Sequence, residues 1–511
     1  MSRIGYEKVR TGCLTCKKRK VKCDESKPTC LKCRKSGKEC AGYITAPVGS
    51  ISWSRLLSSG HSRSEERSLD LFRDVVGPAL LGPVASSSWT GTMFQLSRQE
   101  NGPARDAILS ISLLFESSSS SNAAVPGSPS PPERQQRAAV LYYNRALRHV
   151  ATEQHDARMV LCLSVMFITI ELLRYNPRAA FEHCRHALHI LQGSDTNGDI
   201  FKIVLAIFRH LSVFPSFIGT TLSDYHLVPE NETITYHGFK HIFEASEAMD
   251  SLMSRSARLV REFDLFRQGP LATSMPTTSL LTSWHYLRQD LNAWYSGLSA
   301  VRRRPRVLVV AEEQSLYRIL ELRWLLCDIW VDKVLFPEET RYDAYRGHFE
   351  RIRDLAKEEA DTIVLCGSSD ESSLPAEKGL APILHFAALK CRFLKLRLEI
   401  LVLLQRMVSN GEAMWDSATM EAVGRRIIGL EHGIETNSEQ PIDSLLESCL
   451  MEDPVVPSEE QRVENFYLED DTHMSPLPSG PKMQRRPVHF VFGRSNQGPR
   501  IKVKDWIILP A

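Results

Sequence analysis

Large aliphatic side chains are scarce in the first 43 residues of the chain. Between Met1 and Tyr43 they are limited to Ile4, Val9, Leu14, Val21 and Leu31. A segment of about 40 residues buries too little apolar surface to fold on its own, so an ordinary hydrophobic core is excluded here. Its folding energy must come from disulfides or from bound metal.

The chain also lacks the marks of secretion, of membrane insertion and of common enzyme classes. Residues 1–8 are polar and charged, so we expect no signal peptide and therefore reduced thiols. No stretch fits G-x-S-x-G, a P-loop, G-x-G-x-x-G after a strand, or H-E-x-x-H. The apolar run from Met159 to Ile170 is too short to cross a bilayer and predicts a buried helix. We predict that the protein is not an enzyme and has no membrane partner.

Half of the 12 cysteines form an internal repeat near the N-terminus. The repeat has the spacing C-x2-C-x6-C and recurs after 17 residues. Its members are Cys13, Cys16 and Cys23 in the first half and Cys30, Cys33 and Cys40 in the second. Reduced thiols at C-x2-C spacing are typical metal ligands, and structural zinc takes four thiolates in a tetrahedron. We therefore predict that these six cysteines bind zinc.

Six thiolates fill the ligand positions of two zinc ions if two of them bridge both ions. The symmetry of the repeat makes the first cysteine of each half, Cys13 and Cys30, the natural bridge. The first ion would then be bound by Cys13, Cys16, Cys23 and Cys30, and the second by Cys13, Cys30, Cys33 and Cys40. Structural zinc contributes roughly 10–16 kcal/mol at neutral pH, which is enough to fold a segment this short.

Positive charge is concentrated in the same segment. The loop after Cys16 carries five cations, which are Lys17, Lys18, Arg19, Lys20 and Lys22. Residues 1–45 hold 13 Lys+Arg against 4 Asp+Glu, a net charge of +9, which leaves −7 for the rest of a chain whose total is +2. A basic surface of this kind is typical of polyanion binding. We predict that these five cations form a DNA-binding face.

The cysteine spacings and the basic loop, together with Arg10, Gly12 and Tyr43, resemble the binuclear zinc cluster of fungal transcription factors. The resemblance implies two zinc ions on six cysteines. It also implies that Arg19 and Lys20 read bases in the major groove, while Lys17 and Lys22 contact phosphates. Members of this family usually read CGG-type triplets, which suits bidentate contacts from Arg or Lys to guanine.

The remainder of the chain predicts a mainly α fold, with a small zinc-stapled module followed by a linker and a large all-α domain. The expected domains are the cluster at 9–43, a flexible linker at 44–68, an α-helical regulatory domain at 69–440 with a disordered insert at 117–132, and an acidic tail of low order at 441–511. Helices are expected over 104–116, 133–153, 156–175, 179–192, 239–266, 280–298, 312–336, 345–363 and 382–407, because apolar residues recur there at three and four. Gly193 is the expected C-cap of the fourth.

A second resemblance covers roughly residues 69–193. Scattered apolar and aromatic positions there resemble the start of the helical regulatory domain that follows many fungal zinc clusters, among them Phe72, Trp89, Phe94, Tyr143 and Leu188. Residues 51–72 show no sustained period of 3.5, so no coiled coil is predicted and a homodimer is left open.

Two parts of the C-terminal region are left with alternatives. Residues 442–471 mix acids with bulky apolar residues, which fits an acidic activation segment or a solvated negative loop equally well. Residues 488–492 and 501–508 are left open as short strands or irregular chain.

A second metal site is weighed on a predicted helix and set aside. Its candidate ligands are Glu182, His183, Cys184, His186 and His189. Such clusters are common on helices, and no further ligands can be named elsewhere, so these are interpreted as ordinary core and surface residues.

The sequence as a whole predicts a nuclear, sequence-specific DNA-binding transcription regulator that is directed to RNA polymerase II. Its expected partners are double-stranded DNA and the transcription machinery or co-regulators. The rival hypothesis is an α-helical ligand-binding or enzymatic protein whose zinc or thiol module does not bind DNA.

Overall fold

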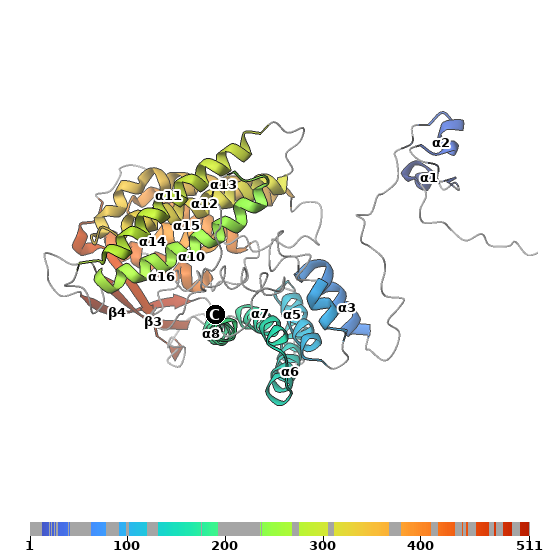
Figure 1. Cartoon of the computed structure of the whole chain (residues 1–511), viewed down its shortest axis with the longest axis horizontal. Coiled ribbons are helices and arrows are strands. Elements are labelled where there is room, and N and C mark those ends of the chain that lie inside the picture. Colours follow the sequence, from blue (N-terminus) through green and yellow to red (C-terminus); the bar gives the residue numbers. More distant parts are fainter. Residues whose placement is uncertain are drawn as a thin grey trace, which may run out of the picture. The chain divides into compact units, whose positions relative to one another are not determined.

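A computed structural model of the chain shows a small cysteine-rich module, two groups of helices and a C-terminal sheet (Figure 1). It describes residues 13–19, 21, 23–24, 26, 29–38, 40, 63–77, 91–98, 102–119, 131–174, 176–192, 236, 238–267, 275–304, 311–366, 380–409, 417–434, 442, 446–447, 456–469, 475–476, 484–492 and 501–509. The chain divides into two compact units, Met1–Arg63 and Ser64–Ala511. The prediction of a small N-terminal module followed by a mainly helical chain is confirmed.

In the described part of the N-terminal module, the buried side chains are those of cysteines. It contains two short helices, α1 (Leu14–Lys18) and α2 (Leu31–Lys35). Among the residues of the module that the structure describes, the buried cluster consists of cysteines alone. The aliphatic side chains of Val21 and Leu31 are 42% and 39% exposed, so they do not supply the core. The buried side chains described in this module are those of cysteines, which fits the expectation that it lacks an ordinary hydrophobic core.

The first helical group surrounds the buried helix α5. Its elements are α3 (Arg63–Leu71), η2 (Phe72–Val76), α5 (Pro103–Ser119), α6 (Pro131–Thr152), α7 (Ala157–Leu173) and α8 (Pro177–Gln192). Three of these helices begin at a proline. Proline suits the first turn, because a backbone N–H at that position has no partner within the helix and its absence costs nothing. Helix α5 packs against α6 and α7, and α7 packs against α8. The apolar run of α7 is buried in this core, as predicted.

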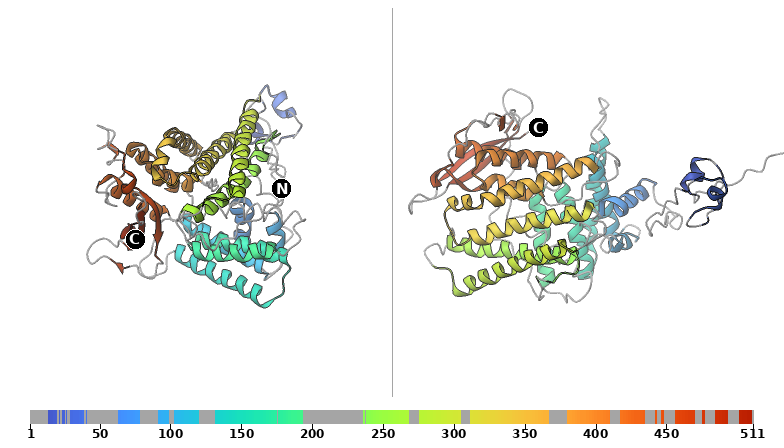
Figure 2. Two further views of the ribbon diagram at one scale, coloured as in Figure 1. Left: turned by 60° about the vertical axis from the view of Figure 1, so that its left-hand side comes forward. Right: turned by 90° about the horizontal axis from the view of Figure 1, so that it is seen from above.

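The second helical group is a set of long helices that lie alongside one another (Figure 2). Its elements are α10 (Ile242–Arg267), α11 (Thr278–Arg302), α12 (Ala311–Lys333), η5 (Glu339–Tyr345), α13 (Arg346–Cys366), α14 (Leu380–Lys390), α15 (Leu394–Ser409) and α16 (Ser417–His432). The indole of Trp294 is fully buried and donates to the carbonyl of Ala245 at 2.8 Å, which ties α11 to α10. Among the described helices, none is both long and apolar enough to cross a membrane.

The C-terminal region forms an antiparallel sheet. After η6 (Glu459–Gln461) come β1 (Val463–Leu468), β2 (Ser475–Pro476), β3 (Gln484–Phe492) and β4 (Lys502–Leu509). Strand β3 is central, with β1 and β2 along one edge and β4 along the other. The register pairs Phe466 with Phe490 and Phe490 with Val503. Phe466, Phe490 and Ile507 share a buried cluster with Val423 and Ile427 of α16, so one sheet face packs on that helix.

These strands differ from the tail of low order expected over residues 441–511. Buried charges explain the difference. The fully buried carboxylate of Glu431 in α16 accepts from Arg392 at 3.0 Å, from Arg397 at 2.5 Å and from the backbone N–H of Val463 at 2.7 Å. Strand β1 is thereby fixed to α16 and to the turn between α14 and α15. Residues 488–492 and 501–508, left open above, lie in strands β3 and β4.

Most predicted helices occur with shifted ends, and two differences are larger. The single helix expected over 382–407 is two helices, α14 and α15, with a break at 391–393. The second difference is helix α16, which the structure contains but which none of the predicted ranges covers. The ends of the expected linker and insert are also helical, since α3 begins at Arg63, α5 ends at Ser119 and α6 begins at Pro131. The rest of both segments, and the Gly193 cap, lie outside the described residues.

Candidate metal centre and nucleic-acid interface

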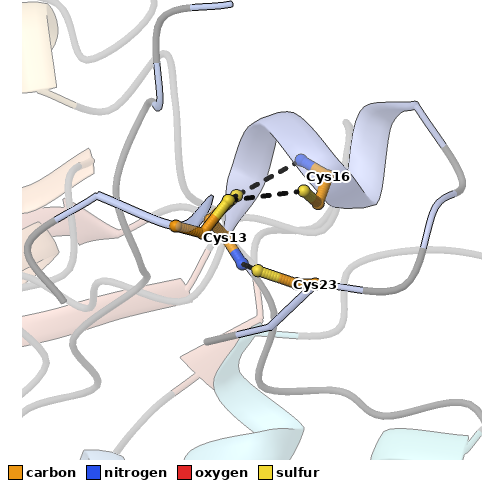
Figure 3. A group of neighbouring side chains, drawn as sticks. Cys13, Cys16 and Cys23 are labelled. Atoms are coloured by element: carbon orange, nitrogen blue, oxygen red, sulfur yellow. Dashed lines mark hydrogen bonds between the residues drawn. The ribbon is translucent and has the colours of Figure 1, made fainter. Parts of the chain in front are cut away.

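The six cysteines of the repeat come together as two groups of four. The sulfurs of Cys13, Cys16, Cys23 and Cys30 lie within 4.8 Å of one another, and so do those of Cys13, Cys30, Cys33 and Cys40. Cys13 and Cys30 belong to both groups. This division has the same membership as the two ligand sets inferred from the repeat. Figure 3 shows Cys13, Cys16 and Cys23 turned toward one another at the start of α1.

The repeat in the sequence is also a repeat in the backbone. The sulfur of Cys13 accepts the N–H of Cys16 at 3.3 Å, and the sulfur of Cys30 accepts the N–H of Cys33 at 3.3 Å. Each first cysteine thus fulfils the role of an N-cap, because its side chain satisfies a free N–H of the first turn. The helix ends match as well. Val21 donates to the carbonyl of Cys16 and Lys38 to that of Cys33, both at 3.1 Å.

The two halves meet through their sulfurs. Cys13 and Cys30 are 3.6 Å apart, and Cys16 and Cys30 are 3.7 Å apart. Burial raises the pKa of the Cys13 thiol to about 12 and raises the pKa values of Cys16 and Cys30 as well. A divalent cation within bonding distance has the opposite effect, since it stabilises the thiolate. A closed set of four sulfur donors is the chemistry of structural zinc, so the residues present fit this metal.

Asp24 is a structural residue of the module that the sequence analysis did not assign. Its carboxylate accepts hydrogen bonds from the backbone N–H groups of Leu31 and Lys32, both at 2.9 Å, and from the hydroxyl of Ser26. The bond from Ser26, followed by the two backbone bonds, holds the pKa of Asp24 well below its usual range. Asp24 therefore satisfies free N–H groups of α2 from the preceding loop. Its place directly after Cys23 was the only available signal.

The structure places part of the predicted DNA-binding face. Lys18 and Arg19 are exposed at the end of α1. The guanidinium of Arg19 donates to the hydroxyl of Ser36 at 2.8 Å, so it reaches the other half of the module. The backbone of Lys17 lies in α1, whereas its side chain, Lys20 and Lys22 lie outside the described residues.

The second candidate metal cluster does not form a group of ligands. His183 bonds the hydroxyl of Tyr143 at 2.8 Å, and Cys184 is buried. Glu182 pairs with Arg185 one helical turn away, while His186 and His189 point to solvent. In the part of the chain that the structure describes, metal-ligand groups of three or more residues occur only among the N-terminal cysteines.

Comparison with known proteins agrees with this geometry. Residues 11–47 match the family described as the fungal Zn(2)-Cys(6) binuclear cluster domain. Transcriptional regulatory protein moc3 of Schizosaccharomyces pombe is 38% identical over 105 residues, which cover 19% of this chain and 18% of that protein. White-opaque regulator 2 of Candida albicans is 61% identical over 41 residues, 8% of this chain and 9% of that protein.

A third relative has the same kind of match. Sterol uptake control protein 2 of Candida albicans is 50% identical over 46 residues, which cover 9% of this chain and 6% of that protein. The chain thus spans less than a fifth of the length of each of these relatives in the matched region. The cysteine repeat, the shared pair Cys13 and Cys30 and the family match together identify the N-terminal module as a fungal Zn(2)-Cys(6) binuclear cluster domain.

Proposed function

We propose that this protein is a zinc-dependent, sequence-specific DNA-binding regulator of transcription by RNA polymerase II. The observation that carries the proposal is the pair of cysteine groups that share Cys13 and Cys30. A cluster of this form folds a small module around metal and leaves its outer surface free. In this chain that outer surface includes the exposed cations Lys18 and Arg19.

The six cysteines would hold two zinc ions, with Cys13 and Cys30 as bridging ligands. The zinc ions supply cross-links between the two halves and no reaction chemistry. Because the second cysteine of each half lies within α1 or α2, these cross-links fix how the two short helices are oriented. Because α1 is held in one orientation relative to α2, the basic loop after Cys16 would enter a DNA groove in one defined orientation.

Two kinds of contact account for affinity and for specificity. Lys17 and Lys22 would neutralise phosphates, and Lys18 would add to the positive charge of the same face. These charges strengthen binding to every sequence and make it sensitive to salt. Arg19 and Lys20 would reach base edges, where Arg or Lys bonds the O6 and N7 atoms of guanine. The expected half-site is a CGG-like triplet read in the major groove.

The regulatory role rests on the relatives and on the helical portion. The relatives are named as a transcriptional regulatory protein, a regulator and a control protein. We propose a cluster domain over 9–43 and a helical regulatory domain over 69–440. The region after residue 440 contains the sheet of β1 to β4 and is not a tail of low order. The protein would act in the nucleus and bind double-stranded DNA, with the helical domain contacting the transcription machinery or co-regulators.

Genome-wide DNA occupancy of the tagged full-length protein tests the proposal, with Cys13→Ala as the matched variant. We expect sharp peaks over a shared triplet motif that disappear in Cys13→Ala. If a folded, zinc-loaded protein gives no peaks, the proposal is wrong. The rival hypothesis of a helical ligand-binding protein or enzyme would then be favoured.

A further inference from the structure

Helix α6 has an outer face on which four arginines surround one leucine. We call this face the arginine stripe. Its members are Arg134, Arg137, Leu141, Arg145 and Arg148. The arginines lie four and seven residues to either side of Leu141, so all five side chains share one face of the helix. Helix α6 lies at the margin of its helical group in Figure 1.

The stripe is exposed to solvent. Leu141 is 72% exposed, whereas apolar side chains on the opposite face of α6, such as Tyr143, are buried. All four arginines are exposed as well. Leu141 therefore contributes nothing to the core that α6 forms with α5. An exposed leucine is ordinary in itself, but its place at the centre of four cations is not explained by the fold.

Three of the four arginines have no acidic partner among the described residues. They are Arg134, Arg137 and Arg148. The fourth, Arg145, donates to the buried carboxylate of Asp106 in α5, with 2.5 Å between its Nε and a carboxylate oxygen. That pairing fixes one arginine beside Leu141 and leaves the others free to bind. The charge is also local, because the chain beyond residue 45 has a net charge of −7.

We propose that the arginine stripe is a docking surface for an acidic helical segment of a partner protein. The segment would carry a large apolar residue at its centre and Asp or Glu about one and two turns to either side. Along an α-helix, positions four and seven residues away lie about 6 and 10 Å from the centre, so such a segment would match the spacing of the arginines. This inference is independent of DNA binding by the cluster.

Charge excludes two other occupants. A second copy of α6 laid antiparallel on the stripe would place arginine against arginine, because the pattern is symmetric about Leu141. A nucleic acid would satisfy the arginines but would set charged phosphates against the exposed leucine. An acidic helix with an apolar centre satisfies both the arginines and Leu141.

The test uses full-length protein and a fluorescent alanine-rich helical peptide. The peptide has leucine at its centre and glutamate four and seven residues to either side. Binding is measured by fluorescence anisotropy at low ionic strength. We expect Arg137→Glu combined with Arg148→Glu to weaken binding by about tenfold or more, and Leu141→Ser to weaken it by about threefold or more. Arg406→Glu, which changes an exposed arginine on α15, should leave binding unchanged.

Charge reversal provides the second arm. A peptide with lysine in place of glutamate should bind the doubly charge-reversed variant better than it binds the wild type. The proposal is wrong if the acidic peptide does not bind, or if Arg406→Glu weakens binding as much as the stripe variants. It is also wrong if duplex DNA without a cluster site displaces the peptide, and if its binding is weakened by Arg137→Glu combined with Arg148→Glu but not by Leu141→Ser. That outcome would identify a phosphate-binding face.

Discussion

The sulfurs of Cys13 and Cys30 lie 3.6 Å apart, and each belongs to both four-cysteine groups of the module. These residues occupy the same position in the two halves of the repeat, 17 residues apart. Loss of either one would remove a ligand from both proposed zinc sites. Loss of Cys40 would remove a ligand from one site only.

This difference gives the first prediction. Cys13→Ala or Cys30→Ala should lose both zinc ions, whereas Cys40→Ala should retain about one, because the first site keeps all four of its sulfurs. Native mass spectrometry of the purified protein measures the zinc content directly. Retention of two zinc ions by Cys13→Ala would contradict the bridging role.

The second prediction separates base reading from phosphate contact. Arg19→Ala should cost about 1–3 kcal/mol on the preferred site and relax specificity there, because a bidentate contact to guanine is lost. Lys17→Ala should weaken binding to all sequences alike and reduce the salt dependence. Titrations with preferred and scrambled duplexes check both changes. Equal losses on both duplexes for Arg19→Ala would remove its base-reading role.

The third prediction concerns the buried charges that order the C-terminal sheet. Glu431→Gln should lower the free energy of unfolding by about 3–5 kcal/mol, because it leaves Arg397 buried without a counter-charge and leaves Arg392 paired only with Glu339. Glu350→Gln is the matched control, since its pair with Arg346 is largely exposed and is worth about 1 kcal/mol or less. Denaturant titration followed by tryptophan fluorescence reports mainly on the unit Ser64–Ala511, because seven of the eight tryptophans lie in it. Similar losses in the two variants would show that the buried network is not what fixes the sheet.

The fourth prediction is a pH dependence. His385 is buried in α14 with its ring edge against Phe466 of β1, and burial lowers its pKa to about 4 from an ordinary value of 6.5. The folded chain therefore binds fewer protons than the unfolded chain between these pH values. Stability should fall as the pH drops from 6.5 toward 4, with a slope equivalent to about one proton from this group.

Replacement of the ring tests that contribution. His385→Phe should reduce the slope of the free energy of unfolding against pH in this window, while leaving the slope above pH 7 unchanged. Urea titrations at a series of pH values measure both slopes. An unchanged slope between pH 4 and 6.5 would show that His385 does not titrate in this way.

The cluster was predictable because its information is local. The spacing of six cysteines specifies the groups that the structure brings together, and the run of cations after Cys16 marks one half as basic. Asp24 escaped prediction because its partners, the N–H groups of Leu31 and Lys32, become free only once α2 has formed. The contact from Arg19 to Ser36 likewise depends on how the two halves pack.

The helices were predictable where apolar residues recur at helical spacing. They were less predictable where contacts with residues distant in the sequence determine the end of a helix. The break after α14 contains neither glycine nor proline. Instead, Arg392 donates to the carbonyl of Lys390 at 2.8 Å and Arg397 to that of Leu389 at 3.0 Å, so two arginines end the helix. Both arginines are held by Glu431, which lies more than 30 residues later.

Two further differences have their own causes. Helix α16 carries a usable signal, because Met420, Val423 and Ile427 recur at helical spacing, yet the predicted ranges do not include it. The sequence signal for strand β3 is weakened by Pro487, which stands opposite Trp506 in the register with β4. Proline within a central strand is normally evidence against that strand.

The most direct measurement is selection of random-sequence duplexes by the purified full-length chain, with zinc bound and after zinc removal. We expect an enriched motif built on a CGG-like triplet that requires zinc and is lost in Cys13→Ala. A folded chain that carries two zinc ions and enriches no sequence would contradict the central claim that the cluster reads DNA.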